Sequence, residues 1–408
     1  MIVIYIYVHD VFLHMIYPMA QGLHQIGSDL FSWQVIYLLV LSPQLLQYVE
    51  LPGYYLFIFM LAILICIQLH PPRKITISNS FVKMIIVYSA FILYSSVSLL
   101  WAPSVGHSSI ILLDMTTICL LLIAAPGLLI ESNAEFHKLM RIIIYASFLV
   151  GIVIIFGFIS DNYRRPFQIV GAASHIGPGR IIGIGIPIAG FYVSYANRAY
   201  QRLSSLVVLL FLMLAIGISE SRGPLVASIT SLAFILFIYP LINCEDTNTV
   251  KYAASLIISL IISGYLLAIN SLPTLDRVLQ VFRGTADSSF QQRVEFYNIA
   301  GQMWMESPLI GHGLGSFHAE VGVYPHNFIF EIASGLGLIG LSLFTAILYI
   351  VVKQILSTDN SQISALLFGL LIYAIINASI SHDLPGQRHL FFVLGLSTCL
   401  FVVSDSKN

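Results

Sequence analysis

Long apolar stretches recur along the whole of this 408-residue sequence, separated by short polar segments. Only 9% of the residues are charged, whereas a soluble domain carries about 25%. A water-soluble core cannot bury so much apolar side chain, so the pattern predicts an all-α polytopic membrane protein. The net charge of −1 gives no indication of a nucleic-acid partner.

Twelve of these stretches are candidate membrane spans, because a helix needs about 20 apolar residues to cross a bilayer. Residues 1–31 combine aromatic residues with His and Asp, and are either an interfacial helix or a further span. We expect a single integral membrane domain over residues 1–408, with both termini in the cytoplasm. The predicted spans are 33–49, 54–70, 81–101, 108–130, 139–159, 180–197, 203–219, 223–242, 252–270, 326–352, 362–381 and 387–404.

The basic residues divide between the two ends of these spans. One set contains every lysine, and the positive-inside rule assigns its side to the cytoplasm. The other set contains only arginine, whose planar fork binds phosphate in two places. The outer set therefore indicates diphosphate binding, with loop solubility and ion pairing as the alternative. The inner set is Arg73, Lys74, Lys83, Lys138, Arg141, Arg198, Arg202, Lys251, Lys353 and Lys407, and the outer set is Arg164, Arg165, Arg180, Arg222, Arg277, Arg283, Arg293 and Arg388.

The longest hydrophilic insertion, residues 271–325, falls on the outer side and predicts a large periplasmic loop. Within it, residues 290–305 have apolar residues at helical spacing and predict an amphipathic helix over the membrane surface. Three glycines beyond the loop should let another helix approach closely. They are Gly335, Gly337 and Gly340.

The loop ends at Tyr324-Pro325-His326-Asn327. Proline suits a helix start, so we expect His326 and Asn327 in the first helical turn, with Glu331 on the same face. An imidazole titrates near pH 6.5, so His326 could serve as a general base. Local hydrogen bonding at a helix start is the alternative role.

Residues 308–341, PLIGHGLGSFHAEVGVYPHNFIFEIASGLGLIGL, resemble the signature of the O-antigen ligase and O-antigen polymerase superfamily. These bacterial membrane enzymes move glycans off a polyprenyl diphosphate. The resemblance implies a multi-span, GT-C-like glycosyltransferase of the inner membrane, with a periplasmic site and direct displacement that inverts the anomeric centre. The sequence shows neither an outer acidic cluster nor a Walker A motif, so we expect no metal and no cofactor.

The resemblance also implies roles for individual residues. His326 occupies the position of the family's histidine, and Arg180, Arg222 and Arg293 match family arginines that would bind the lipid diphosphate. The alternatives for these arginines are interfacial anchoring, turn formation and solvation. Four further candidates for accessory roles are Asn327, Glu331, Arg388 and His175.

Residues 381–388, SHDLPGQR, resemble a segment common among polymerases of this superfamily, with His382 replacing the usual Gly and Gln387 the usual Asn. This segment favours an O-antigen polymerase that extends lipid-linked repeat units. The alternatives are an O-antigen ligase acting on lipid A–core and, in another class, a lipid-linked sugar transporter. The expected partners are an undecaprenyl-diphosphate-linked oligosaccharide, a glycan acceptor, membrane lipid and a chain-length regulator protein.

Overall fold

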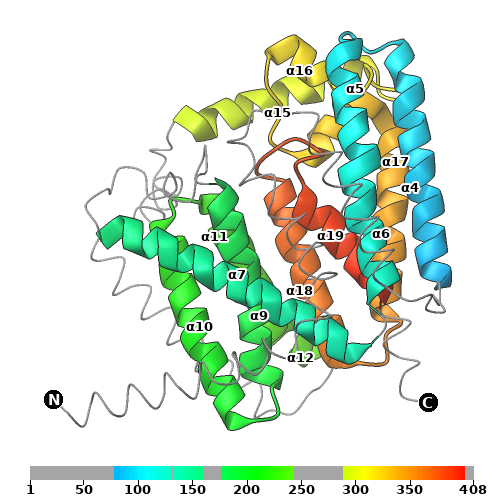
Figure 1. The fold of residues 1–408 in the computed structure, drawn as a ribbon. Helices are drawn as coiled ribbons and strands as arrows, with labels where there is room; N and C mark the ends of the chain where they lie inside the picture. The colour runs from blue at the N-terminus through cyan, green and yellow to red at the C-terminus, as the bar shows by residue number, and fades with distance from the viewer. Residues whose placement is uncertain (1–77, 131, 160–175, 243–287, 400–408) are drawn as a thin grey trace. The chain divides into compact units, whose positions relative to one another are not determined.

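The computed structural model describes residues 78–130, 132–159, 176–242 and 288–399. The chain divides into two compact units, and every described residue lies in the one formed by Val40–Glu50 and Lys74–Asn408. Each regular element in the described ranges is helical (Figure 1). The elements are α4 (Asn79–Val97), η1 (Ser98–Leu100), α5 (Val105–Asp114), η2 (Met115–Cys119), α6 (Leu120–Leu129), α7 (Asn133–Ile159), α9 (Ile176–Tyr195), α10 (Ala199–Ile218), α11 (Arg222–Ala233), η3 (Phe234–Ile238), α12 (Tyr239–Ile242), α15 (Ser288–Glu306), α16 (Ser316–Val321), α17 (Phe328–Leu356), α18 (Ser361–Ala378), α19 (Arg388–Leu396) and η4 (Ser397–Cys399).

Eight helices in the described ranges are long and apolar enough to cross a membrane. This confirms the all-α polytopic fold class. The total of twelve spans stays a prediction, because spans 33–49, 54–70 and 252–270 lie outside the described residues. The single domain over residues 1–408 and the interfacial or spanning position of residues 1–31 also stay predictions. Of the predicted span 387–404, the structure describes only the nine-residue helix α19 and the three-residue turn η4. The eight helices are Asn79–Leu100, Val105–Leu128, Asn133–Ile159, Ile176–Tyr195, Ala199–Ile218, Arg222–Ile242, Phe328–Leu356 and Ser361–Ala378.

The glycine-rich helix α9 is the most buried of the eight. It packs against α7, α10, α11 and α18, because its small residues let the neighbouring helices approach closely. A Cβ added at Gly183, for example, would lie 2.6 Å from the Tyr373 hydroxyl of α18. The first turn of α9, which carries Arg180, is thereby fixed among four helices.

Helix pairing places the described basic residues at two ends of the bundle. Ser80, in the first turn of α4, hydrogen-bonds Gln354, in the last turn of α17, so these helices are antiparallel. His137, near the start of α7, lies 2.9 Å from the Tyr192 hydroxyl near the end of α9. It follows that Lys83, Lys138, Arg141, Arg198, Arg202 and Lys353 lie towards one end, and Arg180, Arg222, Arg293 and Arg388 towards the other. We call the second end the arginine end.

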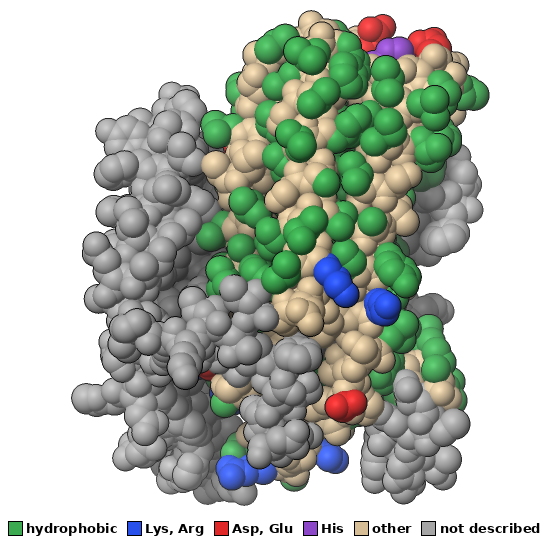
Figure 2. Space-filling view, turned by 90° about the vertical axis from the view of Figure 1, so that its right-hand side faces the viewer, with side chains coloured by type: hydrophobic (Ala, Val, Ile, Leu, Met, Phe, Trp, Pro, Cys, Tyr) green, Lys and Arg blue, Asp and Glu red, His purple; other side chains and the backbone are tan. Residues whose placement is uncertain are grey.

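Apolar side chains cover much of the bundle surface between these ends. Figure 2 shows them across one face, with Lys and Arg in its lower half and His and acidic side chains at its upper edge. The exposed apolar residues of α4 include Ile86 and Leu93, and those of α17 include Leu338 and Tyr349. This distribution suits a surface in contact with lipid chains.

The long helix α17 is interrupted at Gly337, where φ is 62° and ψ is −159°. Residues 308–313 run beside the interruption, and the Tyr94 hydroxyl of α4 donates to the carbonyl oxygens of Ile310 and Leu336, both at 3.1 Å. The backbone groups released by the break are therefore hydrogen-bonded within the protein, as a membrane interior requires. The pairing bonds, 2.8–3.2 Å long, run from His312 N to Ser334 O, Gly313 N to Gly335 O, Leu338 N to Pro308 O and Ile339 N to Leu309 O.

The glycines of α17 serve this backbone pairing. A Cβ on Gly337 would lie 2.5 Å from the carbonyl carbon of Leu309, and one on Gly335 would lie 3.1 Å from the carbonyl oxygen of Gly313. The prediction that these glycines admit another helix was wrong, because the preceding loop occupies that space. Gly340 faces the Leu336 side chain of its own helix.

Candidate functional site

His326 precedes α17 and does not lie in its first turn. The helix begins at Phe328 and has Asn327 as its N-cap. The Asn327 carboxamide oxygen accepts from the backbone N–H groups of Ile329 (2.9 Å) and Phe330 (3.3 Å). His326 adopts a left-handed conformation with φ of 59°, which is uncommon for a residue with a side chain. The predicted helix start was wrong by two residues, because asparagine is favoured as a cap over a helical position.

Two rings enclose the His326 imidazole. Tyr324 meets it edge-on with centroids 4.5 Å apart, and Phe296 of α15 lies parallel to it at 6.2 Å. Burial, together with the positive charge of Arg293, lowers the pKa of His326 to about 4. The imidazole is therefore neutral at pH 7, which is the protonation state that a general base requires.

The helix α15 carries one arginine towards this imidazole and contacts a second. Arg293 lies one turn before Phe296, and its charge acts on both His326 and Tyr324. The Arg222 side chain, at the first residue of α11, donates from Nη2 to Ser289 Oγ at 2.8 Å. Because residues four apart share a helix face, the Arg222 contact and Arg293 lie on the same side of α15.

Arg180 is buried, with 1% of its surface exposed, and points into the segment between α18 and α19. We call residues 379–387 the anchored loop, because the Arg180 guanidinium fixes them through several hydrogen bonds. Arg180 thus faces backbone and side-chain oxygens of the protein rather than an open surface. The bonds run from Nη1 to Gly386 O (3.2 Å) and from Nη2 to Asn377 O (3.2 Å), Ser381 O (3.0 Å), Ser381 Oγ (2.9 Å) and Gln387 Oε1 (3.0 Å).

Further contacts make the anchored loop rigid. Gln387 Nε2 donates to the carbonyl oxygens of Ser381 (2.6 Å) and His382 (3.1 Å), and Gly386 N donates to Asp383 Oδ1 (3.2 Å). Burial raises the pKa of Asp383. Glu331, one turn into α17, accepts a hydrogen bond from the backbone N–H of Leu384. The loop is thereby joined to both α9 and α17.

The remaining candidates from the sequence lie around this loop or outside the described residues. Arg388 follows the loop directly. Its positive charge acts on Asp383 in the loop and on Asp114 at the end of α5. His175 lies outside the described residues. The structure thus brings His326, Arg293, Arg388 and Glu331 together around Tyr324 and the anchored loop.

Tyr324 and His382 were not among the residues that the sequence singled out for the site. The Tyr324 ring lies parallel to that of His382 at 6.3 Å, as well as edge-on to His326. One signal in the sequence was available for Tyr324, since a residue before proline is held in an extended conformation. The signal for His382 was its replacement of the usual Gly in the polymerase-like segment, which marks a backbone position suited to positive φ, but its ring contacts are distant in the chain.

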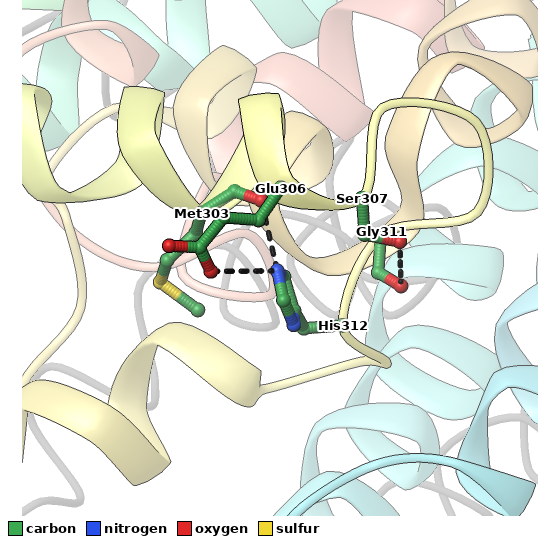
Figure 3. A network of polar contacts seen from close by, with 5 residues as sticks. All are labelled: Met303, Glu306, Ser307, Gly311 and His312. Atoms are coloured by element: carbon green, nitrogen blue, oxygen red, sulfur yellow. Dashed lines mark hydrogen bonds and ion pairs between the residues drawn. The ribbon is translucent and has the colours of Figure 1, made fainter.

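His312, within the glycine-rich run, ties that run to α15 (Figure 3). Its Nε2 lies 2.8 Å from the Met303 carbonyl oxygen and 3.8 Å from Glu306 Oε2. Ser307 Oγ donates to Gly311 O at 3.1 Å. The C-terminal end of α15 is therefore fixed to the segment that pairs with α17, which also fixes the distance between α15 and His326.

The chemistry available at the arginine end is that of anion binding and proton abstraction. Arg222 and Arg293 are cations that could bind a phosphate group, and His326 supplies a neutral base. Among the residues that the structure describes, no group of three or more His, Cys, Asp or Glu side chains is placed to hold a metal ion.

Comparison with known families identifies one region of the chain. Residues 206–345 match the O-antigen ligase family model. The match covers 140 of the 408 residues, from within α10 to the middle of α17. It contains Arg222, Arg293 and His326, whereas Arg180 and Arg388 lie outside it. A search of the curated proteins found no match.

The O-antigen ligase match confirms the resemblance to the ligase and polymerase superfamily. It indicates a glycosyltransferase activity of the O-antigen ligase or polymerase type. The eight apolar helices together with this match point to a membrane protein.

Proposed function

We propose that this protein is an inverting glycosyltransferase that moves a glycan from undecaprenyl diphosphate to an acceptor sugar hydroxyl. One observation carries the proposal. One side of α15 carries Arg293, whose charge acts on the neutral His326 imidazole before α17, and, one turn earlier, Ser289, which accepts a hydrogen bond from Arg222. These are the groups needed for a diphosphate leaving group and for an attacking hydroxyl.

The proposed reaction is a single displacement at the anomeric carbon of the donor. His326 accepts the proton of the acceptor hydroxyl as the new carbon–oxygen bond forms. The bond between the anomeric carbon and the phosphate oxygen breaks, and the diphosphate leaves with the electron pair. Arg222 and Arg293 stabilise the charge that develops there, and removing one such preorganised contact typically costs about 10²–10³ in rate.

In this proposal the buried Arg180 acts without touching the donor. Its terminal nitrogens Nη1 and Nη2 donate to oxygens of the anchored loop and of Asn377, so Arg180 contributes positive potential and loop position instead of a direct contact with the donor. The role of direct diphosphate ligand passes to the arginines of α11 and α15. Arg388 is a further cation at the same end of the bundle.

The arginine end would face the periplasm. Every described lysine lies towards the opposite end, and lysine-rich ends face the cytoplasm under the positive-inside rule. ATP is absent from the periplasm, so a donor that is already activated as a diphosphate suits this location.

The acceptor we propose first is a second lipid-linked repeat unit, which makes the protein an O-antigen polymerase. The support is the likeness of residues 381–388 to a polymerase segment. A ligase that transfers the glycan to lipid A–core is the second candidate, favoured by the description of the matched family model as O-antigen ligase.

Reconstitution of the purified protein with an undecaprenyl-diphosphate-linked repeat unit, with and without lipid A–core, tests both proposals. Longer lipid-linked chains would identify a polymerase, and modified core would identify a ligase. His326→Ala should abolish transfer while the donor still binds. Full activity of His326→Ala, or no transfer by the wild type under any of these conditions, would refute the mechanism.

A further inference from the structure

Backbone strain in the described residues is concentrated at the arginine end. Three residues other than glycine have a positive φ there, namely Glu220 (60°), His326 (59°) and His382 (65°). Side chains make this conformation unfavourable, and proteins retain it mainly where the position matters for function. His326 is the proposed base, so the strain at His382 also calls for an explanation.

The outer ring nitrogen of His382 makes no interaction within the described part of the chain that would offset the energetic cost of this backbone conformation. Its Nε2 is buried and has no hydrogen-bond partner among the described residues. Burial and the charges of Arg180 and Arg388 lower the pKa of His382, so the imidazole is neutral. Glycine would satisfy the backbone at φ of 65° without strain. The ring itself is therefore the part of His382 that the structure uses.

The ring of His382 begins a row of rings that ends beyond the proposed base. It lies parallel to Tyr324 (6.3 Å, 12°), which meets His326 edge-on (4.5 Å, 63°). His326 lies parallel to Phe296 of α15 (6.2 Å, 8°). The imidazole of His326 thus lies between Phe296, which belongs to α15, and Tyr324, whose ring also faces His382 of the anchored loop.

The anchored loop supplies a rigid support for this row. Arg180 fixes the loop from α9, and Glu331 fixes it from α17 through the backbone N–H of Leu384. Tyr324 has little freedom of its own, because it precedes Pro325, which is buried. Movement of His382 would therefore be passed to Tyr324 and then to His326.

We propose that His382 is a positioning residue, through which the anchored loop holds Tyr324 against His326 and sets the orientation of the catalytic imidazole. This inference rests on the proposed function, since it assigns His326 as the base. It also gives Arg180 a role in the reaction that involves no contact with the donor. A base misplaced by about 1 Å can lose 10²-fold in rate, so such support matters to catalysis.

The test compares three substitutions of His382 in the full-length protein, assayed with the undecaprenyl-diphosphate-linked donor. His382→Asn removes the ring but keeps a residue that tolerates positive φ, and His382→Gly also relieves the strain. Both should lower kcat about 10- to 100-fold, with donor KM changed less than about threefold and melting temperature unchanged or raised. His382→Phe keeps a ring and should restore kcat to at least about five times that of His382→Asn.

A pH profile separates positioning from simple packing. Without the His382 support, water should reach His326 more easily, so the acid limb of the kcat/KM profile, which reports the free enzyme, should move from near the pKa of about 4 towards 6.5. The matched control is His318→Ala, which breaks another imidazole stack at this end, His107 on His318 (3.9 Å), and should leave kcat within about twofold.

Two results would overturn the inference. One is full kcat in His382→Asn and His382→Gly; the other is a His382→Phe variant no more active than His382→Asn. Either would leave the proposed function standing if His326→Ala is inactive in the same assay. Absence of transfer by the wild type would instead refute the proposed function itself.

Discussion

Replacing Arg180 distinguishes a loop anchor from a phosphate ligand. In Arg180→Met, three acceptors in the described residues lose the only hydrogen bond the structure shows them receiving, namely Gly386 O, Ser381 Oγ and Gln387 Oε1. A buried acceptor left without a partner costs about 1–3 kcal/mol. The substitution also relieves the burial of a charge, which offsets part of this cost.

The costs of the three unpaired acceptors add, and the relief of the buried charge reduces the total. The net destabilisation of the loop should therefore be about 3 kcal/mol. Each 1.4 kcal/mol corresponds to about a tenfold change in an equilibrium constant, so the population of the detached loop should rise about a hundredfold. Hydrogen exchange of a peptide covering residues 377–387, measured by mass spectrometry in detergent, should accelerate by a similar factor.

The kinetic expectation follows from the same contacts. Arg180→Met should lower kcat for glycan transfer while donor KM stays within about threefold, because the guanidinium does not face the donor. Arg198→Met is the matched control, since Arg198 lies at the opposite end of the bundle and contacts the Tyr200 hydroxyl. A tenfold rise in donor KM with unchanged hydrogen exchange would show that Arg180 is a diphosphate ligand and that the anchoring argument is mistaken.

Other substitutions test the helix break, the donor site and the base. Gly337→Ala should lower the melting temperature by several degrees, because its Cβ would lie 2.5 Å from the Leu309 carbonyl carbon at a positive φ; the control Gly301→Ala, with open space around it, should be neutral or slightly stabilising. Arg293→Met should lower kcat/KM for glycan transfer about 10²–10³-fold through the loss of a charge-assisted contact to the leaving diphosphate, and an unchanged kcat/KM would count against the proposed site. His326 binds a proton below about pH 6.5 in the unfolded chain but only below about 4 in the folded protein, so stability should fall as pH drops from 6.5 to 4. Melting curves over this range should decline less steeply for His326→Asn, and an identical decline would show that His326 is not the group responsible.

The spans could be predicted because the bilayer imposes a length and an apolar composition on each of them. Their ends were less accurate, as at the start of α17, where a hydrogen bond from Ile329 N makes Asn327 a cap. The helix predicted over 290–305 was found as α15, but Phe296 and Ala300 face the protein, while Phe290 and Val294 are exposed. An apolar pattern on a surface helix does not reveal which apolar side meets lipid or water.

The site could be predicted only where neighbouring residues in the sequence decide it. His326 was marked by its own Pro-His-Asn context. The environment of Arg180 could not be foreseen, because the oxygens it contacts belong to residues about 200 positions later in the chain. The role of the signature glycines could not be foreseen either, because their spacing is compatible both with helix–helix packing and with pairing to the preceding loop. Only the non-helical φ and ψ of Gly337 reveal the paired loop.

The interruption of α17 has a consequence for an enzyme that works in bilayers of varying thickness. A continuous helix responds to hydrophobic mismatch by tilting along its whole length. Here residues 308–313 are hydrogen-bonded to both sides of Gly337, so the two parts of α17 are held at a fixed angle although the helix is broken. A tilt of α17 in a thinner or thicker bilayer should therefore carry the glycine-rich run with it and keep that run in register with the start of the helix.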